Sequence, residues 1–451
     1  MVEPNDDPRW RYASSARWFA GKGRHGVARR IDALDWYRPP EPGRPGVRSE
    51  IITIAYPDGS HDYYHLPVSY RPQALSSALI GPAADPALGF AHDATRDPEA
   101  IAILITALSA RVNNGDWSAT LPRGDRLTGP LPARPFTGEQ SNSTVFLGSR
   151  ALVKFFRHLE VGSNLDIQLH EALGRYRVRD IDELYGWVTA SFRSISGPRV
   201  HSDLLMITQQ LKALAEGWPM AVDAARQGRD FSEQSADIGR ALAHIHMALV
   251  QAFPPVMLSG DEIADTMAAR LDQAIGSVPA LAKFRAELVA DFDRLRGRRL
   301  SAQRIHGDFH LGQTLLTPDG WRIIDFEGEP LRPLAERALP DSVWRDVAGM
   351  VRSLDYAAAQ PDPTTSPSEQ ERQERHTWAH RAQSSFLDAY LQLTGVDDQL
   401  DVLDAYVADK AVYEVVYEAR NRPDWVSIPL TAISSWHQHP LRHHRGRTDH
   451  A

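Results

Sequence analysis

Two acidic segments in the second half of the chain carry the residue types that phosphoryl transfer uses. The first reads HGDFHLGQ and contains Asp308 and Gln313; the second reads DFE and begins at Asp325, 17 positions after Asp308, behind an apolar run. Phosphoryl transfer from ATP requires a carboxylate that orients the acceptor hydroxyl, and oxygen ligands that hold Mg²⁺ against the phosphates. Protein kinases supply these groups as Asp-x-x-x-x-Asn followed by Asp-Phe-Gly. The spacing therefore predicts phosphotransfer, with Asp308 as the catalytic base and Gln313 and Asp325 as ligands of Mg²⁺.

Two positions differ from that kinase pattern. Gln313 stands in the place of the Asn, and its side chain is one methylene longer. Glu327 stands in the place of the Gly, where its carboxylate adds a metal ligand or supports the other ligands. The competing interpretation is that these residues only form turns and caps. The strand-turn-strand context and the spacing favour the catalytic interpretation.

A lysine upstream of these segments lies where a kinase has its phosphate-binding lysine. Lys154 is the central residue of the run LVKFF, whose other members are all apolar. An ammonium group inside such a strand is costly unless it meets anions. We expect the ATP phosphates and a helix glutamate to be those anions, with Glu171 as the glutamate and Glu160 as the competing choice. The alternative is a lysine at a strand edge that extends to water.

A polar segment precedes this lysine by ten to sixteen residues and reads GEQSNST. It lacks the glycines with which a Gly-x-Gly-x-x-Gly loop exposes its backbone to phosphates. Hydroxyl and amide groups at a hairpin tip can still donate hydrogen bonds to phosphate oxygens. We therefore predict that Gln140, Ser141 and Ser143 contact the nucleotide, although the same letters also form ordinary turns.

Short strands dominate the first half of the chain. Alternating apolar residues on either side of Pro57-Asp58-Gly59 predict a β-hairpin over 47–70. Two short strands over 144–156, a helix over 167–175 and two further strands over 186–211 predict a small lobe with an antiparallel sheet.

The second half of the chain is mainly helical. Ile238, Leu242, Ile245 and Leu249 form an apolar stripe at helical spacing. Strand-like segments over 305–316 and 321–326 interrupt the helices. We therefore predict an α+β protein with four parts, namely a cap subdomain over 1–125, a small sheet lobe over 126–215, a large helical lobe over 216–435 and a disordered tail over 436–451.

Composition excludes several classes of protein. The chain has 451 residues, 50 Lys and Arg against 58 Asp and Glu, and a net charge of −8, which argues against general nucleic-acid binding. It has no cysteine, so disulfides, thiolate zinc sites and cysteine nucleophiles are excluded. We find no secretory signal and no apolar run long enough to span a bilayer, and we expect a cytoplasmic monomer with no membrane contact.

Together these motifs resemble the aminoglycoside-phosphotransferase-like branch of the protein-kinase fold, and more narrowly the bacterial maltokinases. Further matches are RWFAGKGR from Arg17, PLAER from Pro333, RDVAGMVRSLDYA from Arg345 and YEVVYEARNRPDWVSIPL from Tyr413. The resemblance implies a bilobal kinase-like fold with an N-terminal cap and the cofactors ATP and Mg²⁺. It also implies phosphorylation of maltose at its anomeric hydroxyl, giving maltose 1-phosphate for α-glucan and glycogen synthesis, with trehalose synthase as a functional partner.

The same resemblance places the sugar contacts in the large lobe. They would come from His306, His310, Tyr413, Glu414, Tyr417, Glu418 and Trp425. Glu414 and Glu418 stand four residues apart on a predicted helix, where like charges repel by a few tenths of a kcal/mol. Sugar hydroxyls, Arg420 or Arg422 would offset that repulsion, and Trp425 would stack on a pyranose face. The alternative is a solvated charged helix face beside a core tryptophan.

One segment departs from the maltokinase pattern. Where maltokinases read Asn-Pro-Asp-Leu-Glu, this chain reads NLDIQ from Asn164. The resemblance therefore leaves the carboxylate partner of Lys154 open. Two other functions also remain open, namely a kinase for glucosamine or aminoglycosides, which would use Glu414 and Glu418 as ammonium partners, and a nucleotide-binding pseudokinase that partners trehalose synthase.

Overall fold

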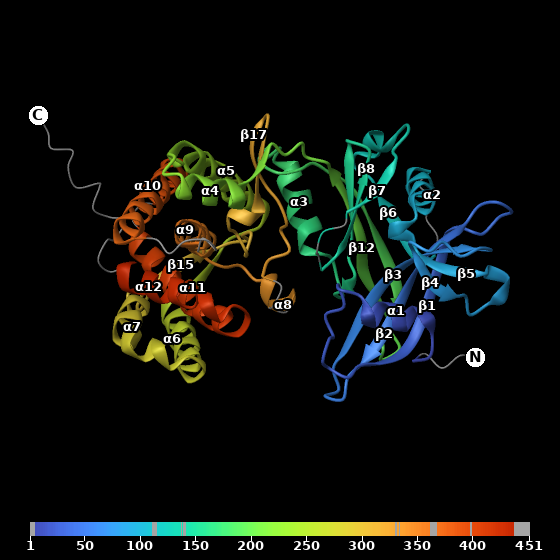
Figure 1. Ribbon diagram of the computed structural model, residues 1–451, viewed down its shortest axis with the longest axis horizontal. Helices are drawn as coiled ribbons and strands as arrows, with labels where there is room; N and C mark the ends of the chain where they lie inside the picture. Colours follow the sequence, from blue (N-terminus) through green and yellow to red (C-terminus); the bar gives the residue numbers. More distant parts are fainter. Residues whose placement is uncertain are drawn as a thin grey trace, which may run out of the picture. The chain divides into compact units, whose positions relative to one another are not determined.

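A computed structural model describes residues 5–110, 115–136, 138, 141–329, 332, 334–360, 368–396 and 399–436. The chain divides into two compact units, each of which is treated by itself (Figure 1). Unit 1 contains Met1–Glu171 and Asp182–Lys212, and unit 2 contains Ala172–Ile181 and Ala213–Ala451. The predicted disordered tail lies outside the described residues, apart from residue 436.

Unit 1 begins with an antiparallel sheet that confirms the predicted hairpin. Its strands β2 and β3 pair around the turn at Pro57-Asp58-Gly59, with Ile52 opposite Tyr64. The order is β1 (Val27–Arg38), β2 (Gly46–Ala55), β3 (His61–Arg71), β5 (Phe90–Asp93) and β4 (Leu79–Pro82), and β10 (His158–Leu159) also pairs with β3. The helices α1 (Pro8–Ser15) and α2 (Pro98–Ser109) belong to the same unit as this sheet. β10 therefore belongs to the first sheet, although the sequence predicts its residues to lie in the small lobe.

The second sheet of unit 1 contains the lysine strand. Its order is β6 (Trp117–Thr120), β11 (Leu184–Arg193), β12 (Arg199–Gln209), β9 (Ala151–Phe155), β8 (Ser143–Leu147) and β7 (Ala133–Pro135). The helix α3 (Leu165–Arg175) follows β10. β6 precedes the predicted boundary at residue 125, yet it pairs with β11.

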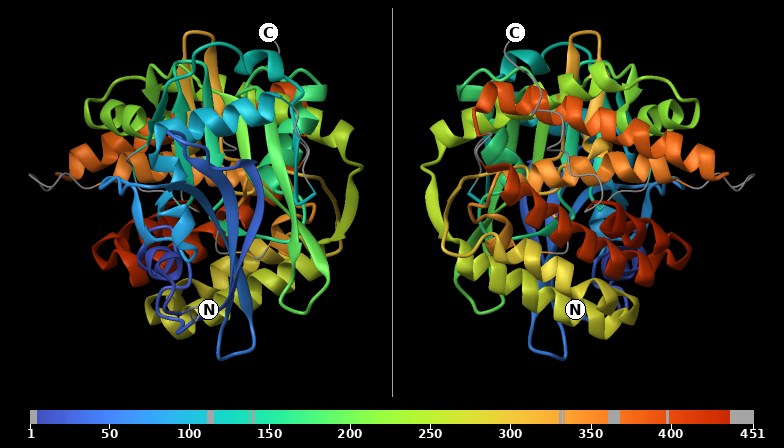
Figure 2. Two further views of the ribbon diagram at one scale, coloured as in Figure 1. Left: turned by 90° about the vertical axis from the view of Figure 1, so that its right-hand side faces the viewer. Right: turned by 90° about the vertical axis from the view of Figure 1, so that its left-hand side faces the viewer.

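One hydrophobic core joins the two sheets of unit 1. The same cluster of buried side chains contains Ile51 of β2, Leu104 of α2 and Phe155 of β9. The β2–β3 hairpin (blue) and the β11–β12 hairpin (green) extend in the same direction in Figure 2, left, and Ile195 N–H donates to the Tyr63 hydroxyl at 2.9 Å. The first sheet is therefore packed directly on the sheet that carries Lys154.

Unit 2 is mainly helical, as predicted. Its longer helices are α4 (Gly217–Arg226), α5 (Ser232–Ala252), α6 (Gly260–Ser277), α7 (Arg285–Asp293), α9 (Trp344–Ala359), α10 (Glu369–Thr394), α11 (Leu400–Asn421) and α12 (Ser427–Trp436). The predicted apolar stripe of α5 is buried. A capping box formed by Ser368 and Glu371 begins α10, and Gly395 in the left-handed conformation ends it.

Short strands complete unit 2. β16 (Thr314–Thr317) and β17 (Gly320–Ile323) form a hairpin, β13 (Ala215–Glu216) pairs with β16, and β14 (Val256–Ser259) pairs with β15 (Arg299–Ala302). The strand predicted over 305–316 is wrong for most of its length, because a loop connects β15 to β16. Gly307 in this loop has φ +84°, a conformation incompatible with a strand.

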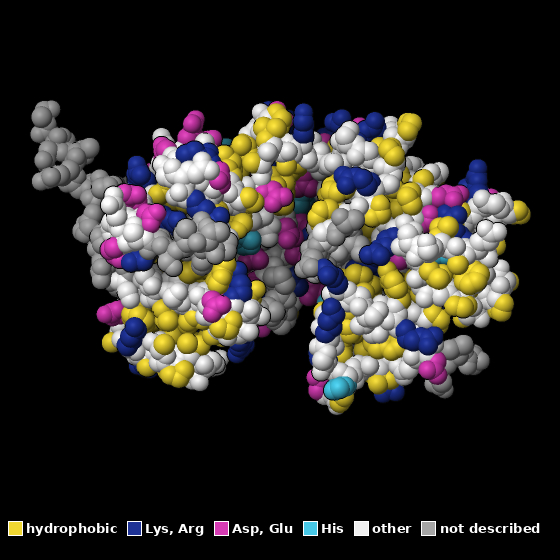
Figure 3. All heavy atoms as spheres, viewed as in Figure 1, with side chains coloured by type: hydrophobic (Ala, Val, Ile, Leu, Met, Phe, Trp, Pro, Cys, Tyr) yellow, Lys and Arg dark blue, Asp and Glu magenta, His cyan; other side chains and the backbone are white. Residues whose placement is uncertain are grey.

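Two further features concern the charges on the surface and the hydropathy of the helices. On the face shown in Figure 3, Lys and Arg side chains are interspersed with Asp and Glu side chains on both units. Among the described helices, none combines the length and the hydropathy that crossing a bilayer requires.

Candidate active site

A buried carboxylate holds the HGD segment of unit 2. Asp346, in the first turn of α9, accepts hydrogen bonds from the backbone N–H of His306 at 2.8 Å and of Gly307 at 2.9 Å. His246 of α5 donates to the same carboxylate at 3.0 Å, and its other ring nitrogen bonds the Tyr390 hydroxyl at 2.9 Å. Burial raises the pKa of Asp346, but these contacts outweigh burial and hold the pKa below its ordinary value. Asp346 is thus an anion that fixes the loop before Asp308.

His306 is buried and joins two loops of the site, and its contact with the sugar stays a prediction. Only 1% of it is exposed, and its ring packs on Phe326 with centroids 4.8 Å apart. Its Nδ1 accepts from the backbone N–H of Asp308 at 3.3 Å, and its Nε2–H donates to the carbonyl oxygen of Ile324 at 3.0 Å. Both ring nitrogens are therefore used to join the two acidic segments.

Asp308 and His310 lie side by side on this loop. The Asp308 carboxylate is partly exposed, and its Oδ2 lies 4.0 Å from Nε2 of His310. Partial burial lowers the pKa of His310, an effect that the Asp308 charge opposes. A neutral imidazole beside an accessible carboxylate can exchange hydrogen bonds with a hydroxylated acceptor.

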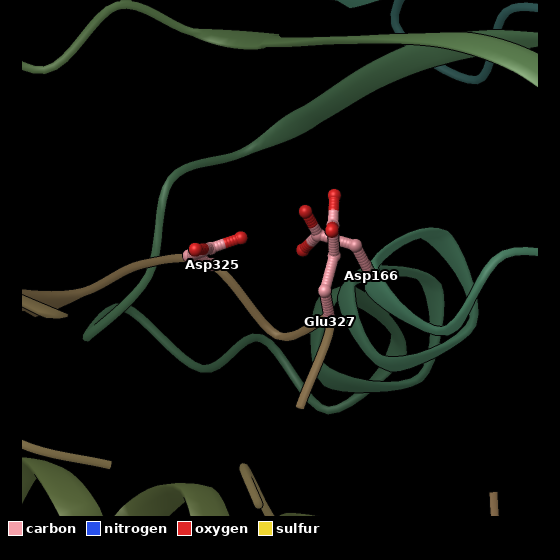
Figure 4. Close-up of side chains that lie close together, drawn as sticks. All are labelled: Asp166, Asp325 and Glu327. Atoms are coloured by element: carbon pink, nitrogen blue, oxygen red, sulfur yellow. The ribbon is translucent and has the colours of Figure 1, made fainter. Parts of the chain in front are cut away.

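The structure brings Gln313 and Asp325 together, as predicted for a metal site. Nε2 of Gln313 lies 3.5 Å from Oδ2 of Asp325, and Ile324 N–H donates to the Gln313 carbonyl at 3.0 Å. Asp325 has φ +67°, in the left-handed region that only glycine adopts freely. Figure 4 shows Asp325 and Glu327 on the loop that follows β17. The role of Glu327 as a metal ligand stays a prediction.

Lys154 lies on β9 of unit 1 and forms an ion pair with Asp166. Its neighbours across the sheet are Met206 of β12 and Thr144 of β8, and its Nζ lies 2.9 Å from Oδ2 of Asp166 on α3. Asn164 orients the start of α3, since its side chain accepts from the Asp166 N–H at 2.9 Å. The sequence motifs favour Glu171, or Glu160, over Asp166 as the carboxylate beside Lys154, and a role for either glutamate stays a prediction.

The Asp166 carboxylate is itself part of a buried charge network. His170, one turn later on α3, places Nδ1 3.0 Å from Asp166 and Nε2 3.0 Å from Asp182. Burial disfavours each charge, but the Lys154 charge and the His170 contact lower the pKa of Asp166. The charges and hydrogen bonds of Asp182 and Asp166 raise the pKa of His170 well above its ordinary value, although burial acts in the opposite direction. An i, i+4 aspartate–histidine pair in the sequence was the signal for this network.

The predicted phosphate-binding segment lies at the start of β8. Ser143 and Asn142 are partly buried, and Ser141 is exposed. Gln140 lies outside the described residues. The Ser143 hydroxyl accepts from Nε of Arg157 at 2.8 Å, and the Asn142 side chain accepts from the Arg157 backbone N–H at 3.2 Å. Their contact with a nucleotide stays a prediction.

Tyr413 of α11 lies close to the Asp308 loop. Burial raises its pKa, and the charge of Glu329, a hydrogen bond to that carboxylate and the charge of Asp308 act in the same direction. Its ring stacks on Tyr417 with centroids 6.2 Å apart, and Nζ of Lys410 lies 5.0 Å above it. Unit 2 thus brings one of the predicted sugar residues to the predicted base.

Glu414 and Glu418 are held by arginines. Arg352 donates to Oε2 of Glu414 from Nε at 2.9 Å and from a terminal nitrogen at 2.7 Å. Glu418 is buried and accepts from Arg422 at 2.7 Å, as predicted for an offsetting cation. The Arg422 guanidinium also lies 4.4 Å from the ring centroid of Trp425. The repulsion predicted between the glutamates is therefore offset within the protein.

A cavity of about 550 Å³ opens in unit 2 beside the same loops. Gly307, Gly328 and Glu329 line it, together with Tyr406 and Asp409 of α11. Its volume lies within the range of small-molecule sites.

Comparison with known proteins shows the family of the chain. The model of the phosphotransferase enzyme family (APH) matches residues 132–392, which is more than half of the chain. The chain belongs to this family. A second family model, the maltokinase N-terminal cap domain, matches residues 12–97. The fold is thus the kinase-like α+β fold of the phosphotransferases, preceded by a cap domain, as the sequence predicted.

Two curated relatives are named glucosamine kinase. The chain is 31% identical to the protein of Streptacidiphilus jiangxiensis over 73% of its own length and 79% of the relative. It is 27% identical to the protein of Mycolicibacterium smegmatis over 70% of its length and 80% of the relative. Among solved structures, a glucosamine kinase in complex with glucosamine, ADP and inorganic phosphate has a TM-score of 0.69 at 21% identity, over 94% of this chain and 98% of that one. That likeness shows the shared fold.

Proposed function

We propose that this phosphotransferase is an ATP-dependent sugar kinase and that glucosamine is its acceptor. The observation that carries the proposal is the placement of Asp308, which the Asp346 carboxylate and the His306 ring fix beside the Gln313–Asp325 pair. The names of the two curated relatives support glucosamine as the acceptor.

Mg²⁺ suits the donor atoms of unit 2. The Gln313 amide oxygen and the Asp325 carboxylate are hard oxygen ligands of the kind that Mg²⁺ prefers. The strained backbone of Asp325 is another sign of a functional position, because such conformations concentrate at binding sites. Bound there, the ion would neutralise charge on the phosphates.

The protein residues then have separate roles. Asp308 accepts the proton of the acceptor hydroxyl as the γ-phosphoryl group leaves ATP. His310 orients that hydroxyl, and Tyr413 contacts the sugar from α11. Lys154 binds the nucleotide phosphates, with its ammonium held by the Asp166 carboxylate. Residues that are held in place before the reaction begins lose little entropy in the transition state.

Maltose is the second candidate acceptor. The match to the maltokinase cap domain over residues 12–97 favours it, together with the motifs that resemble maltokinases. Maltose 1-phosphate synthesis, a place in glycogen synthesis and a partnership with trehalose synthase would follow only for this acceptor. Glu414 and Glu418 do not decide between the candidates, since arginines already bind both carboxylates.

A coupled ADP-release assay distinguishes the acceptors. Glucosamine, maltose, glucose and kanamycin are compared at matched concentrations with ATP and Mg²⁺, and we expect the highest kcat/KM for glucosamine.

Asp308→Asn should lower kcat by about 10²–10⁴-fold with little change in ATP affinity, because it removes the base and leaves the nucleotide ligands. Turnover that persists in this variant on every sugar would disprove the assignment of the base. ATP binding without ADP release on any acceptor would instead support a pseudokinase.

A further inference from the structure

A single buried arginine joins the first sheet of unit 1 to the predicted phosphate-binding segment. Arg157 lies between β9 and β10 and is 1% exposed. One terminal nitrogen of its guanidinium lies 2.7 Å from Oδ2 of Asp93 and 3.0 Å from Oγ1 of Thr95. Asp93 ends β5 and Thr95 lies in the turn that follows, both in the part of the chain that matches the cap domain.

Arg157 also contacts the residues at the start of β8. Nε of Arg157 donates to the Ser143 hydroxyl, and its backbone N–H donates to the Asn142 side chain. The Arg157 carbonyl accepts from the backbone N–H of His65 on β3 at 2.8 Å. Arg157 therefore contacts β3 and the end of β5 in the first sheet, and it also contacts Asn142 and Ser143 of the segment that precedes Lys154.

The cap-side end of this connection is rigid. Asp93 is 1% exposed and also accepts from the Tyr12 hydroxyl at 2.8 Å and from the Thr95 hydroxyl at 2.6 Å. A fully buried ion pair adds little net stability compared with apolar packing, because burying both charges is costly. Its directional hydrogen bonds do fix the geometry of the groups it joins.

We propose that the cap domain positions Asn142 and Ser143, at the start of β8, through Arg157, so that Asp93 and Arg157 are positioning residues for ATP. The proposal rests on the proposed function and on the predicted contact of Ser143 with the nucleotide. Ser143 stands opposite Phe155 in the sheet, one residue after Lys154. Movement of Arg157 therefore displaces the Ser143 hydroxyl beside the phosphate-binding lysine.

Cap-side variants test this role without altering a residue of the nucleotide site. Asp93→Asn removes the anion, Thr95→Val removes one acceptor, and Thr95→Ser retains that acceptor. The control is Asp97→Asn, because Asp97 is equally buried in the same region but pairs with Arg71 at 2.8 Å and with Ser69 at 2.8 Å. The assays are calorimetric titration of the full-length protein with MgATP, steady-state KM and kcat, and thermal unfolding.

We expect Asp93→Asn to raise Kd and KM for ATP about tenfold, the size of one lost charge-assisted hydrogen bond, with the sugar KM within about twofold. Thr95→Val should weaken ATP binding less, and Thr95→Ser should restore it. Asp97→Asn should lower Tm as Asp93→Asn does and leave the Kd for ATP unchanged. A merely structural role predicts the same loss of Tm in both variants with no selective loss of ATP affinity.

Two outcomes would overturn the inference. In the first, Asp93→Asn and Thr95→Val both bind MgATP with the same Kd as the wild-type protein. In the second, the wild-type protein itself does not bind MgATP. The first outcome leaves the proposed function intact, because sugar phosphorylation is measured separately. Failure of the wild type to phosphorylate any sugar while it binds ATP would remove the proposed function and leave the positioning role testable.

Discussion

The substitution His170→Gln tests the buried charge network beneath Lys154. His170 lies between two carboxylates, with Asp166 and Asp182 each 3.0 Å from a ring nitrogen. Both His170 and Asp166 are almost fully buried. Glutamine retains a neutral hydrogen-bonding group in this position and removes the positive charge, so the variant isolates the electrostatic part of the interaction.

The expected loss of stability follows from the contact distances. At 3.0 Å each carboxylate–imidazolium contact is worth about 5 kcal/mol at an effective dielectric constant of about 20. The cost of burying the charges offsets much of this energy, and removing one partner of a buried pair costs about 3–5 kcal/mol in measured cases. Because glutamine keeps a hydrogen bond, we expect about 3 kcal/mol. For a unit of about 200 residues, this lowers Tm by about 6–12 °C.

The difference in the free energy of unfolding between wild type and His170→Gln should depend on pH. The folded-state pKa of His170 is raised above its ordinary value of 6.5, so its contribution is complete below pH 6.5 and is lost as pH rises through the folded-state pKa. The pKa of Asp166 is lowered from 3.8, so its contribution is present above pH 3.8 and is lost as pH falls through the lowered value. The difference between wild type and His170→Gln should therefore shrink as the solution becomes alkaline.

Urea unfolding of wild type and variant from about pH 6 to about pH 10 measures this difference. The control is His92→Gln, because His92 is buried in the same unit and burial lowers its pKa. Its stability difference should stay constant at pH values well above 6.5, since His92 is neutral there in both the folded and the unfolded state. A difference for His170→Gln that stays flat or grows over this range would refute the proposal that a charged imidazole holds Asp166.

Two further predictions concern the loops of unit 2. Gln313→Ala should raise the Mg²⁺ concentration needed for half-maximal turnover by about tenfold, because it removes one oxygen ligand of the ion. Titration of the steady-state rate with Mg²⁺ measures this concentration. An unchanged Mg²⁺ requirement would exclude Gln313 as a ligand. Gly349→Ala should lower both kcat and Tm, because a Cβ on Gly349 would meet the Phe309 carbonyl oxygen at 2.3 Å beside Asp308. Gly276→Ala is the matched helix control, with nothing within 4 Å of its Cβ, and thermal unfolding should show a gain of up to about 1 kcal/mol.

Local patterns predicted the elements and the chemistry. The β2–β3 hairpin, the buried stripe of α5 and the spacing of Asp308, Gln313 and Asp325 could all be identified from neighbouring residues. Strand alternation and helical periodicity report on which face is buried, and they depend on a few adjacent positions. The predicted strand before β16 is a loop because its backbone N–H groups donate to the side chain of Asp346, 39 residues after Gly307, and not to another strand.

The sequence by itself determined which residue types are available for phosphoryl transfer and the order in which they occur. Only the tertiary structure decided their partners. Lys154 pairs with Asp166, Glu414 pairs with Arg352 62 residues away, and Arg157 reaches Asp93 64 residues away. The physical reason is that an ion pair is chosen by distance and burial in the folded chain, and many carboxylates of equal chemistry compete in the sequence for each cation.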